Sequence, residues 1–271
     1  MSSCTTRGTC SASPATEAGT VTRTYLVRGM IVGLVAGLFA FLFAKVVGER
    51  WVGQAIAFES AQDKAAGMTG GHELVSRTVQ NTVGLGTGVL VFGVTIGGLF
   101  GLVCAIAQGR VGRLGVRGTA LLIASLGFVS VCLVPFLKYP PNPPAIGNPD
   151  TIGHRTALYF IMIAASILLT VLCVALARRL SAHHDAWFSV LVALGVFVVV
   201  ASAFLIVLPG VNEVPKDFPA VTLYRFRLAS LGINLVIWTT LGLGFGWLTQ
   251  RQLTAARRTA QASDVRGAMS V

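Results

Sequence analysis

The chain has 271 residues, of which 54% are hydrophobic and only 11% are charged. Soluble domains carry about 25% charged residues, and a chain with so few cannot cover its folded surface with polar groups, so these totals exclude an ordinary soluble protein. The net charge of +11 would suggest nucleic acid in a soluble domain. Here the basic residues stand in short clusters between apolar runs, which is how membrane topology is encoded, so we exclude nucleic acid and expect membrane lipid around the chain.

The chain begins with residues 1–22, which are rich in Ser, Thr, Ala and Gly and have no apolar period, so we predict a disordered cytoplasmic tail. Six apolar segments follow, each with roughly the 20 residues that a helix needs to cross the hydrocarbon core. They cover about 29–47, 82–107, 118–137, 156–177, 187–208 and 228–249. Backbone polar groups in lipid must be satisfied within each segment. We therefore predict an all-α polytopic membrane helix bundle over residues 23–250, with proline-rich extracytoplasmic loops and a basic cytoplasmic tail at 251–271.

The first apolar segment has an alternative interpretation as a signal peptide that is cleaved after "AIA" at 55–57. The apolar run is longer than the core of a signal peptide, and Lys45, Glu49 and Arg50 stand between the run and that position. We therefore favour a retained span.

The stretch after the first span is predicted to contain a short amphipathic helix. Trp51, Ala55, Phe58 and Ala61 recur there at helical spacing, although Gln62 interrupts the stripe. Such a stripe on a polar helix is typical of a segment that lies in the membrane interface.

Glycines recur at every fourth position in three of the apolar segments. They are Gly29, Gly33 and Gly37, then Gly93, Gly97 and Gly101, then Gly242 and Gly246. Small residues at this spacing let helices approach closely in lipid, so we predict close helix packing. A sliding interface for alternating access is the functional alternative.

Basic residues divide unevenly between the two sets of connections. The set that contains both tails, the loop "GRVGRLGVRG" and the "ARR" at 177–179 holds twelve of the 21 Lys and Arg but three of the ten acids. The positive-inside rule places this set in the cytoplasm. Six spans then leave both termini there, and most of the acids face outward.

A polar corner, "LVPFLKYPPNPPAIGNPDTIGHRTALYF" at 133–160, interrupts the apolar runs and carries six prolines that fix its backbone. Asp150 stands just before the fourth span, where an aspartate can cap a helix by accepting backbone N–H bonds. With His154 and the neighbouring Asn142 and Asn148, it instead offers the oxygen and nitrogen donors that suit a divalent metal. Both roles stay open.

A second corner, "VLPGVNEVPKDFP" at 207–219, precedes the sixth span. Proline suits the first turn of a helix, so a helix that starts at the end of this stretch carries Arg225 and Arg227 about two turns in. Ionisable groups at that depth are functional candidates, and we expect ion pairs there, as also for Arg155 at the start of the fourth span. The acids expected as partners of Arg225 and Arg227 are Glu213, Asp217 and Asp150.

The remaining cysteine and histidine residues give little indication of a chemical function. Cys104, Cys132 and Cys173 lie inside apolar runs, where cysteine acts as a small hydrophobe, and His183 and His184 fit a solvated loop. No HExxH, GxSxG or GxxxxGK[ST] motif occurs. We therefore predict that the chain is not an enzyme.

Four long stretches carry a resemblance to a known family. They are "LVPFLKYPPNPPAIGNPDTIGHRTALY", "LPGVNEVPKDFPAVTLYRFRLASLG", "RGMIVGLVAGLFAFLFAKVVGERWVGQAIAFE" and "VSRTVQNTVGLGTGVLVFGVTIGGLFGLV". Over about residues 25–250 the chain resembles the CbtA-type predicted cobalt transporter subunits. The resemblance implies a polytopic protein of the bacterial inner membrane, linked to cobalt supply for cobalamin synthesis, with a small single-span CbtB-type partner whose end is histidine-rich. It implies no established ligand set and no firmly bound cofactor.

Two functions remain open. The first is a permease subunit for Co²⁺ or a similar divalent cation, for which the spans offer no carboxylate or histidine near the midplane, so that backbone carbonyls and Asn234 would carry the ion. The second is a non-transporting scaffold that binds a partner subunit, and a homo-oligomer is compatible with either. The candidate metal ligands are Asp150, His154, Glu213, Asn212, Glu59 and Glu73.

Overall fold

The computed structural model describes residues 14–67, 76, 79–110, 114–144 and 146–269. Six helical stretches in these ranges are long and apolar enough to cross a membrane, and the described residues contain no strand, so the all-α prediction is confirmed. The stretches are Val21–Ala65, Gln80–Ala107, Val116–Lys138, Ile152–Leu180, Ala186–Val207 and Ala220–Ser263.

Each of the first three stretches contains one π-helical turn, in which the backbone hydrogen bonds run to the fifth residue. The first stretch runs through α1 (Pro14–Phe43), the π-helix η1 (Ala44–Gly48) and α2 (Glu49–Ala65), and the second consists of the π-helix η2 (Gln80–Gly84) and α4 (Leu85–Ala107). The third consists of α5 (Val116–Gly127), the π-helix η3 (Phe128–Leu133) and α6 (Val134–Lys138). After these come the 3₁₀ turn η4 (Pro149–Thr151) and the helices α7 (Ile152–Leu180), α8 (Ala186–Val207) and α9 (Ala220–Met269). Helix α1 begins and α9 ends inside the two segments predicted as tails.

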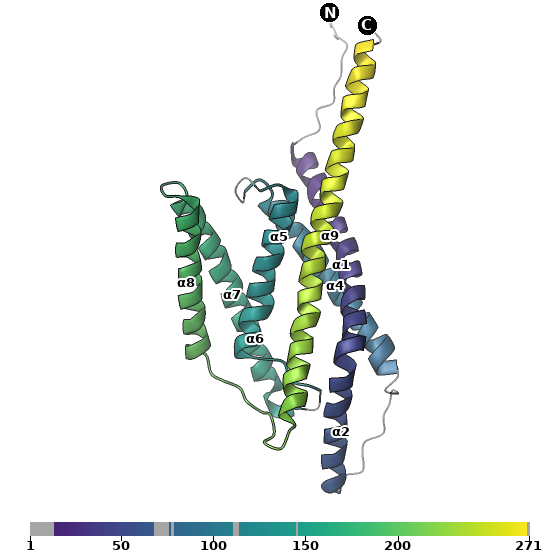
Figure 1. Cartoon of the computed structure of the whole chain (residues 1–271), viewed down its shortest axis with the longest axis vertical. Coiled ribbons are helices and arrows are strands. Elements are labelled where there is room, and N and C mark those ends of the chain that lie inside the picture. The colour runs from purple at the N-terminus through teal and green to yellow at the C-terminus, as the bar shows by residue number, and fades with distance from the viewer. Residues whose placement is uncertain (1–13, 68–75, 77–78, 111–113, 145, 270–271) are drawn as a thin grey trace, which may run out of the picture.

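The helices form two groups (Figure 1). Helices α1, α4, α5 and α9 pack on one another and are here called the four-helix body, whereas α7 and α8 form a hairpin beside it. Helix α1 begins and α9 ends at one end of the molecule, the terminal end. The opposite end, the corner end, carries α2 and the two proline-containing connections at 139–151 and 208–219.

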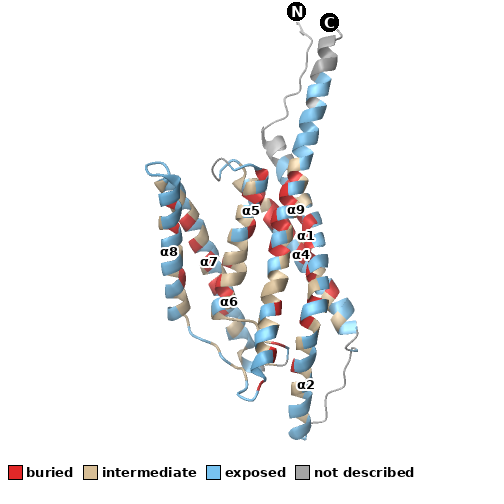
Figure 2. Ribbon diagram, viewed as in Figure 1, coloured by how far each residue is buried: buried red, intermediate tan, exposed pale blue. Residues whose placement is uncertain are grey.

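Large apolar side chains cover the outside of the molecule. Val46 is 83% exposed, Ile206 is 81% exposed and Val199 is 68% exposed, and exposed residues dominate α8 (Figure 2). Such a surface is unfavourable in water, but it matches hydrocarbon because the backbone polar groups are bonded within the helices. The four middle stretches, of 22 to 29 residues, measure about 33–44 Å at 1.5 Å per residue and so cross a hydrocarbon core of about 30 Å.

Glycine brings the backbones of α1 and α4 into direct contact. A Cβ atom on Gly29 would lie 2.1 Å from the carbonyl oxygen of Gly97, and a Cβ atom on Gly33 would lie 2.2 Å from the carbonyl oxygen of Gly93. No side chain fits at such distances, so residues other than glycine would force the two helices apart. The predicted glycine packing of the first two spans is therefore confirmed.

Aromatic side chains fill the space between this helix pair and α9. Phe245 is fully buried, and its ring centroid lies 5.6 Å from that of Tyr25 and 5.5 Å from that of Phe100, both edge-on. Trp238 lies against Gly127 at the end of α5, where a Cβ atom would come within 2.1 Å of the indole ring. The centre of the four-helix body is thus packed so closely that a larger side chain at Gly127 would collide with Trp238.

Among the described residues, the hairpin contacts the third stretch only in the half of the bundle nearer the corner end. Helix α7 contacts η3 and α6 of the third stretch, and α8 contacts mainly α7. The hydroxyl of Ser166 in α7 donates to the carbonyl of Ser130 in η3. Towards the terminal end α7 diverges from α5 (Figure 1), so the hairpin is held in the half of the bundle nearer the corner end and stands away from the body in the other half.

The stripe after the first span is helical, as predicted, but it is not a separate short helix. Helix α2 continues α1 through η1 as one helix and projects beyond the bundle (Figure 1). The stripe packs on the chain that leads into α9: Ala55 is buried, and the ring of Phe58 lies 5.1 Å from that of Phe218. Apolar residues recur at the same spacing whether a helix packs on another segment or lies on a membrane surface. The sequence pattern alone therefore cannot distinguish these two arrangements.

We predict that Gly97→Ala lowers the free energy of unfolding by about 1–3 kcal/mol, the usual cost of overpacking, because its Cβ atom would lie 2.3 Å from the Gly29 carbonyl oxygen. Gly88→Ala in the same helix is the matched control, since nothing lies within 4 Å of its Cβ position. The measurement is thermal unfolding of both variants in the same detergent. Equal melting temperatures would contradict the close backbone contact.

Candidate functional site

Side chains at the end of α6 fasten the two proline-containing connections together. Helix α6 ends where the Tyr139 N–H bonds the Pro135 carbonyl at 2.7 Å. The ammonium of Lys138 then donates to the Leu205 carbonyl at 2.7 Å, and the Tyr139 hydroxyl donates to the Pro209 carbonyl at 2.9 Å. The last carbonyls of a helix have no partner within it, so the bond from Lys138 also satisfies one carbonyl in the last turn of α8.

Glu213 is the central acceptor of the corner. Its Oε2 lies 3.0 Å from Arg155 Nη1 and accepts the Asn148 N–H at 2.8 Å, while its Oε1 accepts the Thr151 hydroxyl. Both charged side chains are largely shielded, at 25% exposed for Arg155 and 18% for Glu213. Hydrogen bonds to an ionised group are the stronger kind, so this carboxylate joins the two connections to the start of α7.

Arg155 reaches Glu213 because residue 147 is glycine. Gly147 has a φ of +132°, and a Cβ atom there would lie 2.3 Å from Arg155 Nη1. Arg155 Nη2 donates to the Asn148 carbonyl at 3.3 Å, whereas its Nε is buried without a hydrogen-bond partner in the described part of the chain. Beside this guanidinium lies a cavity of about 290 Å³. Its lining includes Tyr139, Asn142, Arg155, Thr156, Tyr159 and Val211.

These surroundings keep Glu213 ionised. Hydrogen bonds from the Thr151 hydroxyl and the Asn148 N–H, together with the charge of Arg155, hold the pKa of the Glu213 carboxyl below its usual value of 4.5. A lowered folded-state pKa means that the carboxylate stabilises the fold above the unfolded-state pKa and loses this effect as the pH falls through the folded-state pKa. The corner is therefore tied by charge at neutral pH and loosens only in acid.

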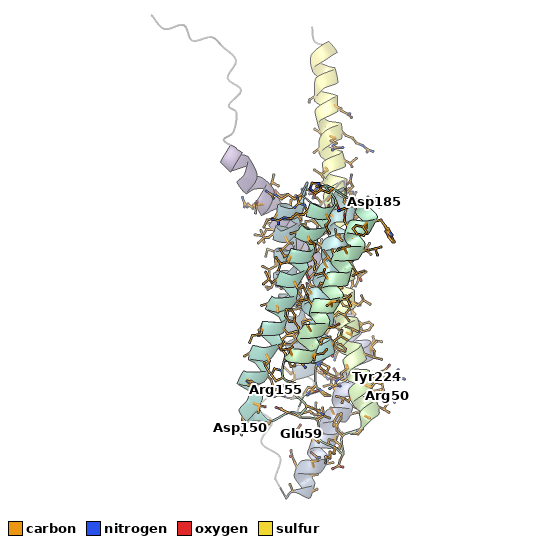
Figure 3. All side chains as sticks on the ribbon, turned by 90° about the vertical axis from the view of Figure 1, so that its left-hand side faces the viewer. Arg50, Glu59, Asp150, Arg155, Asp185 and Tyr224 are labelled. Atoms are coloured by element: carbon orange, nitrogen blue, oxygen red, sulfur yellow. The ribbon has the colours of Figure 1, made fainter. Side chains whose placement is uncertain are left out.

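Asp150 does not cap α7, so the capping role predicted for it is wrong. The N-cap residue is Thr151, and Asp150 lies in the preceding 3₁₀ turn, where its own N–H donates to Asn148 Oδ1 at 3.0 Å. Both Asp150 and His154 are exposed, and Figure 3 shows Asp150 and Arg155 together at the corner end. The Asp150 carboxylate has no hydrogen-bond or ion-pair partner among the described residues and so stays available.

The other predicted ligands are spread over the corner end. Asn212 is exposed, and its Oδ1 accepts the Val214 N–H at 3.5 Å. Glu59 is half-buried on α2 (Figure 3), and Glu73 lies outside the described residues. Within the described ranges, no three His, Cys, Asp or Glu side chains come together in a group that could hold a metal ion.

Arg225 and Arg227 form no ion pair in the described part of the chain, which differs from the expected pairing with the corner acids. Arg227 instead donates from Nη2 to Asn142 Oδ1 at 3.0 Å and from Nε to the Pro141 carbonyl at 3.3 Å. Arg225 lies 6.0 Å from the ring centroid of Trp51, a cation–π distance. Each arginine thus tethers the start of α9 to a neighbouring segment.

A polar cluster lies deeper in the bundle. Cys132 in η3 is not the simple apolar filler that its place in an apolar run predicts, because its Sγ lies 3.2 Å from Asn234 Oδ1 and accepts the Trp238 indole N–H at 3.2 Å. Ser130 lies in the same π-helical turn as Cys132, and it is hydrogen-bonded to Ser166 of the facing helix α7. The sequence signal for this cluster was Asn234, a polar residue inside an apolar run. Its partner Cys132 could not be identified in advance, because the π-helical turn η3 that carries Cys132 has no sequence pattern.

Six membrane-length helices with an apolar outer surface, joined by a polar corner, define the chain as a multi-pass helical membrane protein. The sequence model of a family described as "probable cobalt transporter subunit (CbtA)" matches residues 22–250. The chain belongs to the CbtA family, as its resemblance predicted. No curated protein and no solved structure matches the chain.

We predict that Glu213→Gln loosens the corner, because the neutral amide gives up the ion pair with Arg155. The protection factor of the Asn148 amide in hydrogen–deuterium exchange should fall by about threefold, in keeping with a partly exposed ion pair. It should fall likewise in the unaltered chain as the pH falls through the folded-state pKa of Glu213, below 4.5. Asp217→Asn is the control, since it neutralises an exposed carboxylate of the same connection. Equal exchange in both variants would show that the ion pair does not hold the corner.

Proposed function

We propose that the chain is the membrane-embedded subunit of a transporter for cobalt(II) or a similar divalent transition metal ion that supplies cobalamin synthesis, with no catalytic activity of its own. The family match over residues 22–250 carries this proposal. We place the protein in a bacterial inner membrane with the terminal end in the cytoplasm, because the short basic loops lie at that end. The corner end then faces outward.

The charges of the corner favour a cation at its rim over a cation in its interior. Asp150 is exposed and unpartnered among the described residues, so its negative charge can attract a cation, although Lys and Arg outnumber the acids on this side of the chain. Arg155 and Arg227 make the inner part of the corner positive. We therefore assign the first contact with the ion to Asp150 and His154, and we assign Glu213 to holding the corner together. The further candidate ligands at this end are Asn212, Glu59 and Glu73.

The polar cluster around η3 is the proposed passage through the bundle. Cys132, Asn234 and the Ser130 carbonyl offer sulfur and oxygen atoms at a depth where the described spans carry no carboxylate or histidine. Rearranged backbone at membrane depth is tolerated where it is buried in protein, and π-helical turns occur often at functional sites.

A partner subunit completes the proposed transporter. A transition-metal ion exchanges its waters for several ligands, and the described residues bring no three such side chains together. The family description names a subunit, and the resemblance implies a small single-span CbtB-type protein with a histidine-rich end. We propose that this end supplies the missing ligands.

The test is accumulation of radioactive cobalt in cells that lack other cobalt importers, with the chain expressed alone and together with the single-span partner. Asp150→Asn should lower uptake by roughly tenfold, because a carboxylate attracts a divalent ion at about 4 Å with roughly 2 kcal/mol even in water. Asp185→Asn is the matched control: it makes the same change at the terminal end (Figure 3), where asparagine still caps α8.

No uptake by the well-expressed pair would contradict the transport proposal and leave the chain as a membrane scaffold. Equal uptake by Asp150→Asn and Asp185→Asn would reject Asp150 as the first contact. A reversed pair, Arg155→Glu with Glu213→Arg, separates the two roles of Glu213. If Glu213 holds the corner through its ion pair, cobalt uptake by the reversed pair should be partly higher than uptake by Glu213→Gln alone. If Glu213 is a metal ligand, the reversed pair should not recover uptake, because it places no carboxylate at position 213.

A further inference from the structure

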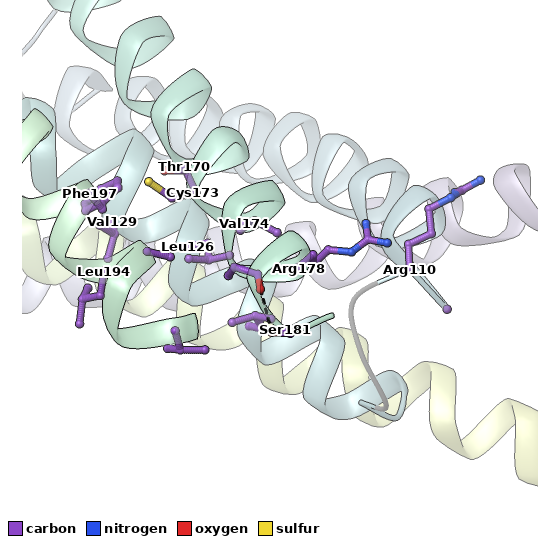
Figure 4. Close-up of a pocket in the computed structure, with 15 residues that line it drawn as sticks. Arg110, Leu126, Val129, Thr170, Cys173, Val174, Arg178, Ser181, Leu194 and Phe197 are labelled. Atoms are coloured by element: carbon purple, nitrogen blue, oxygen red, sulfur yellow. Dashed lines mark hydrogen bonds between the residues drawn. The ribbon is translucent and has the colours of Figure 1, made fainter. Parts of the chain in front are cut away.

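A cavity of about 710 Å³ lies between α5, α7 and α8 near the terminal end, far from the corner (Figure 4). It exists because α7 meets the third stretch at η3 and α6 and then diverges from α5. Leu126, Val129, Val174, Leu194 and Phe197 give it apolar walls. Its volume falls within the range of about 300–1,000 Å³ that is usual for ligand sites.

Two arginines stand on the same side of this cavity (Figure 4). Arg110 follows α4 after Gly109, whose φ of +73° turns the chain, and its Nη1 donates to the Ile106 carbonyl. Arg178 lies in the last turn of α7. Both are exposed, and neither forms an ion pair with a described acid. Their charge is therefore not neutralised by a described acid, and the remaining N–H groups of the planar arginine fork match a phosphate group.

We propose that this cavity binds one anionic phospholipid, with an acyl chain along the apolar walls and the phosphate between Arg110 and Arg178. Apolar walls at membrane depth favour hydrocarbon over water. Two guanidinium groups on one side of the cavity, neither paired with a described acid, leave positive charge there that an anion would neutralise. Basic pockets between membrane helices on the cytoplasmic side take anionic headgroups in the same way. Such a lipid would hold the hairpin at its observed distance from α5.

The test uses the full chain in mild detergent, titrated with phosphatidylglycerol or with phosphatidylcholine of the same acyl chains and followed by native mass spectrometry. Phosphatidylglycerol should bind more tightly, by about fivefold for each arginine and roughly 25-fold for the pair. Arg110→Gln with Arg178→Gln should abolish this preference. Arg179→Gln is the matched control, because Arg179 is also exposed but does not line the cavity.

A second variant tests the apolar part of the site. Val129→Trp should fill part of the cavity and weaken the binding of both lipids, while its melting temperature reports whether the fold is kept. Equal affinity of the unaltered chain for the two lipids would overturn the proposal, as would a preference that survives in the double arginine variant. A co-purified small membrane protein that is lost from Val129→Trp in place of lipid would show that the cavity holds a partner helix.

Discussion

The direct contact between the backbones of α1 and α4 is the constraint on which the rest of the structure depends. Lipid gives helices no hydrophobic reason to associate, so packing and hydrogen bonds must hold them. Gly29 and Gly33 let the two helices touch over several turns, and the groove beside them takes α9 through the buried ring of Phe245. Helix α5 then packs on α9, where Gly127 lies against Trp238.

The hairpin of α7 and α8 is attached by polar interactions and not by glycine and aromatic packing. Polar bonds hold it at the corner, through Arg155, Glu213 and Lys138, and one buried serine contact holds it at η3. Beyond that level the described residues show little contact between α7 and α5. The molecule is therefore closely packed where glycine and aromatic residues meet, and it is open where the hairpin leaves the body. The proposed ion entry and the proposed lipid site lie at the two ends of this hairpin.

Sequence predicted the parts of the structure that depend on one segment at a time. Length and hydropathy found six spans, and glycine spacing found a packing face on α1 and another on α4, but not that these two faces meet. Contacts that join distant segments could not be predicted. Nothing in the spacing shows that Glu213 is taken by Arg155 through Gly147, and the π-helical turn that turns Cys132 towards Asn234 has no sequence pattern. Sequence thus singled out the corner as a candidate region, while the contacts that its residues make needed the fold.

The orientation of the corner decides whether it is the entry for the cation. We would place single cysteines at Thr156, which lines the corner cavity, and at Ser181, at the terminal end, in a chain whose native cysteines are replaced. A membrane-impermeant maleimide applied to intact cells should label Thr156→Cys and should reach Ser181→Cys only after the membrane is permeabilised. Labelling of Ser181→Cys in intact cells, with Thr156→Cys protected until permeabilisation, would invert the topology and contradict the proposed entry.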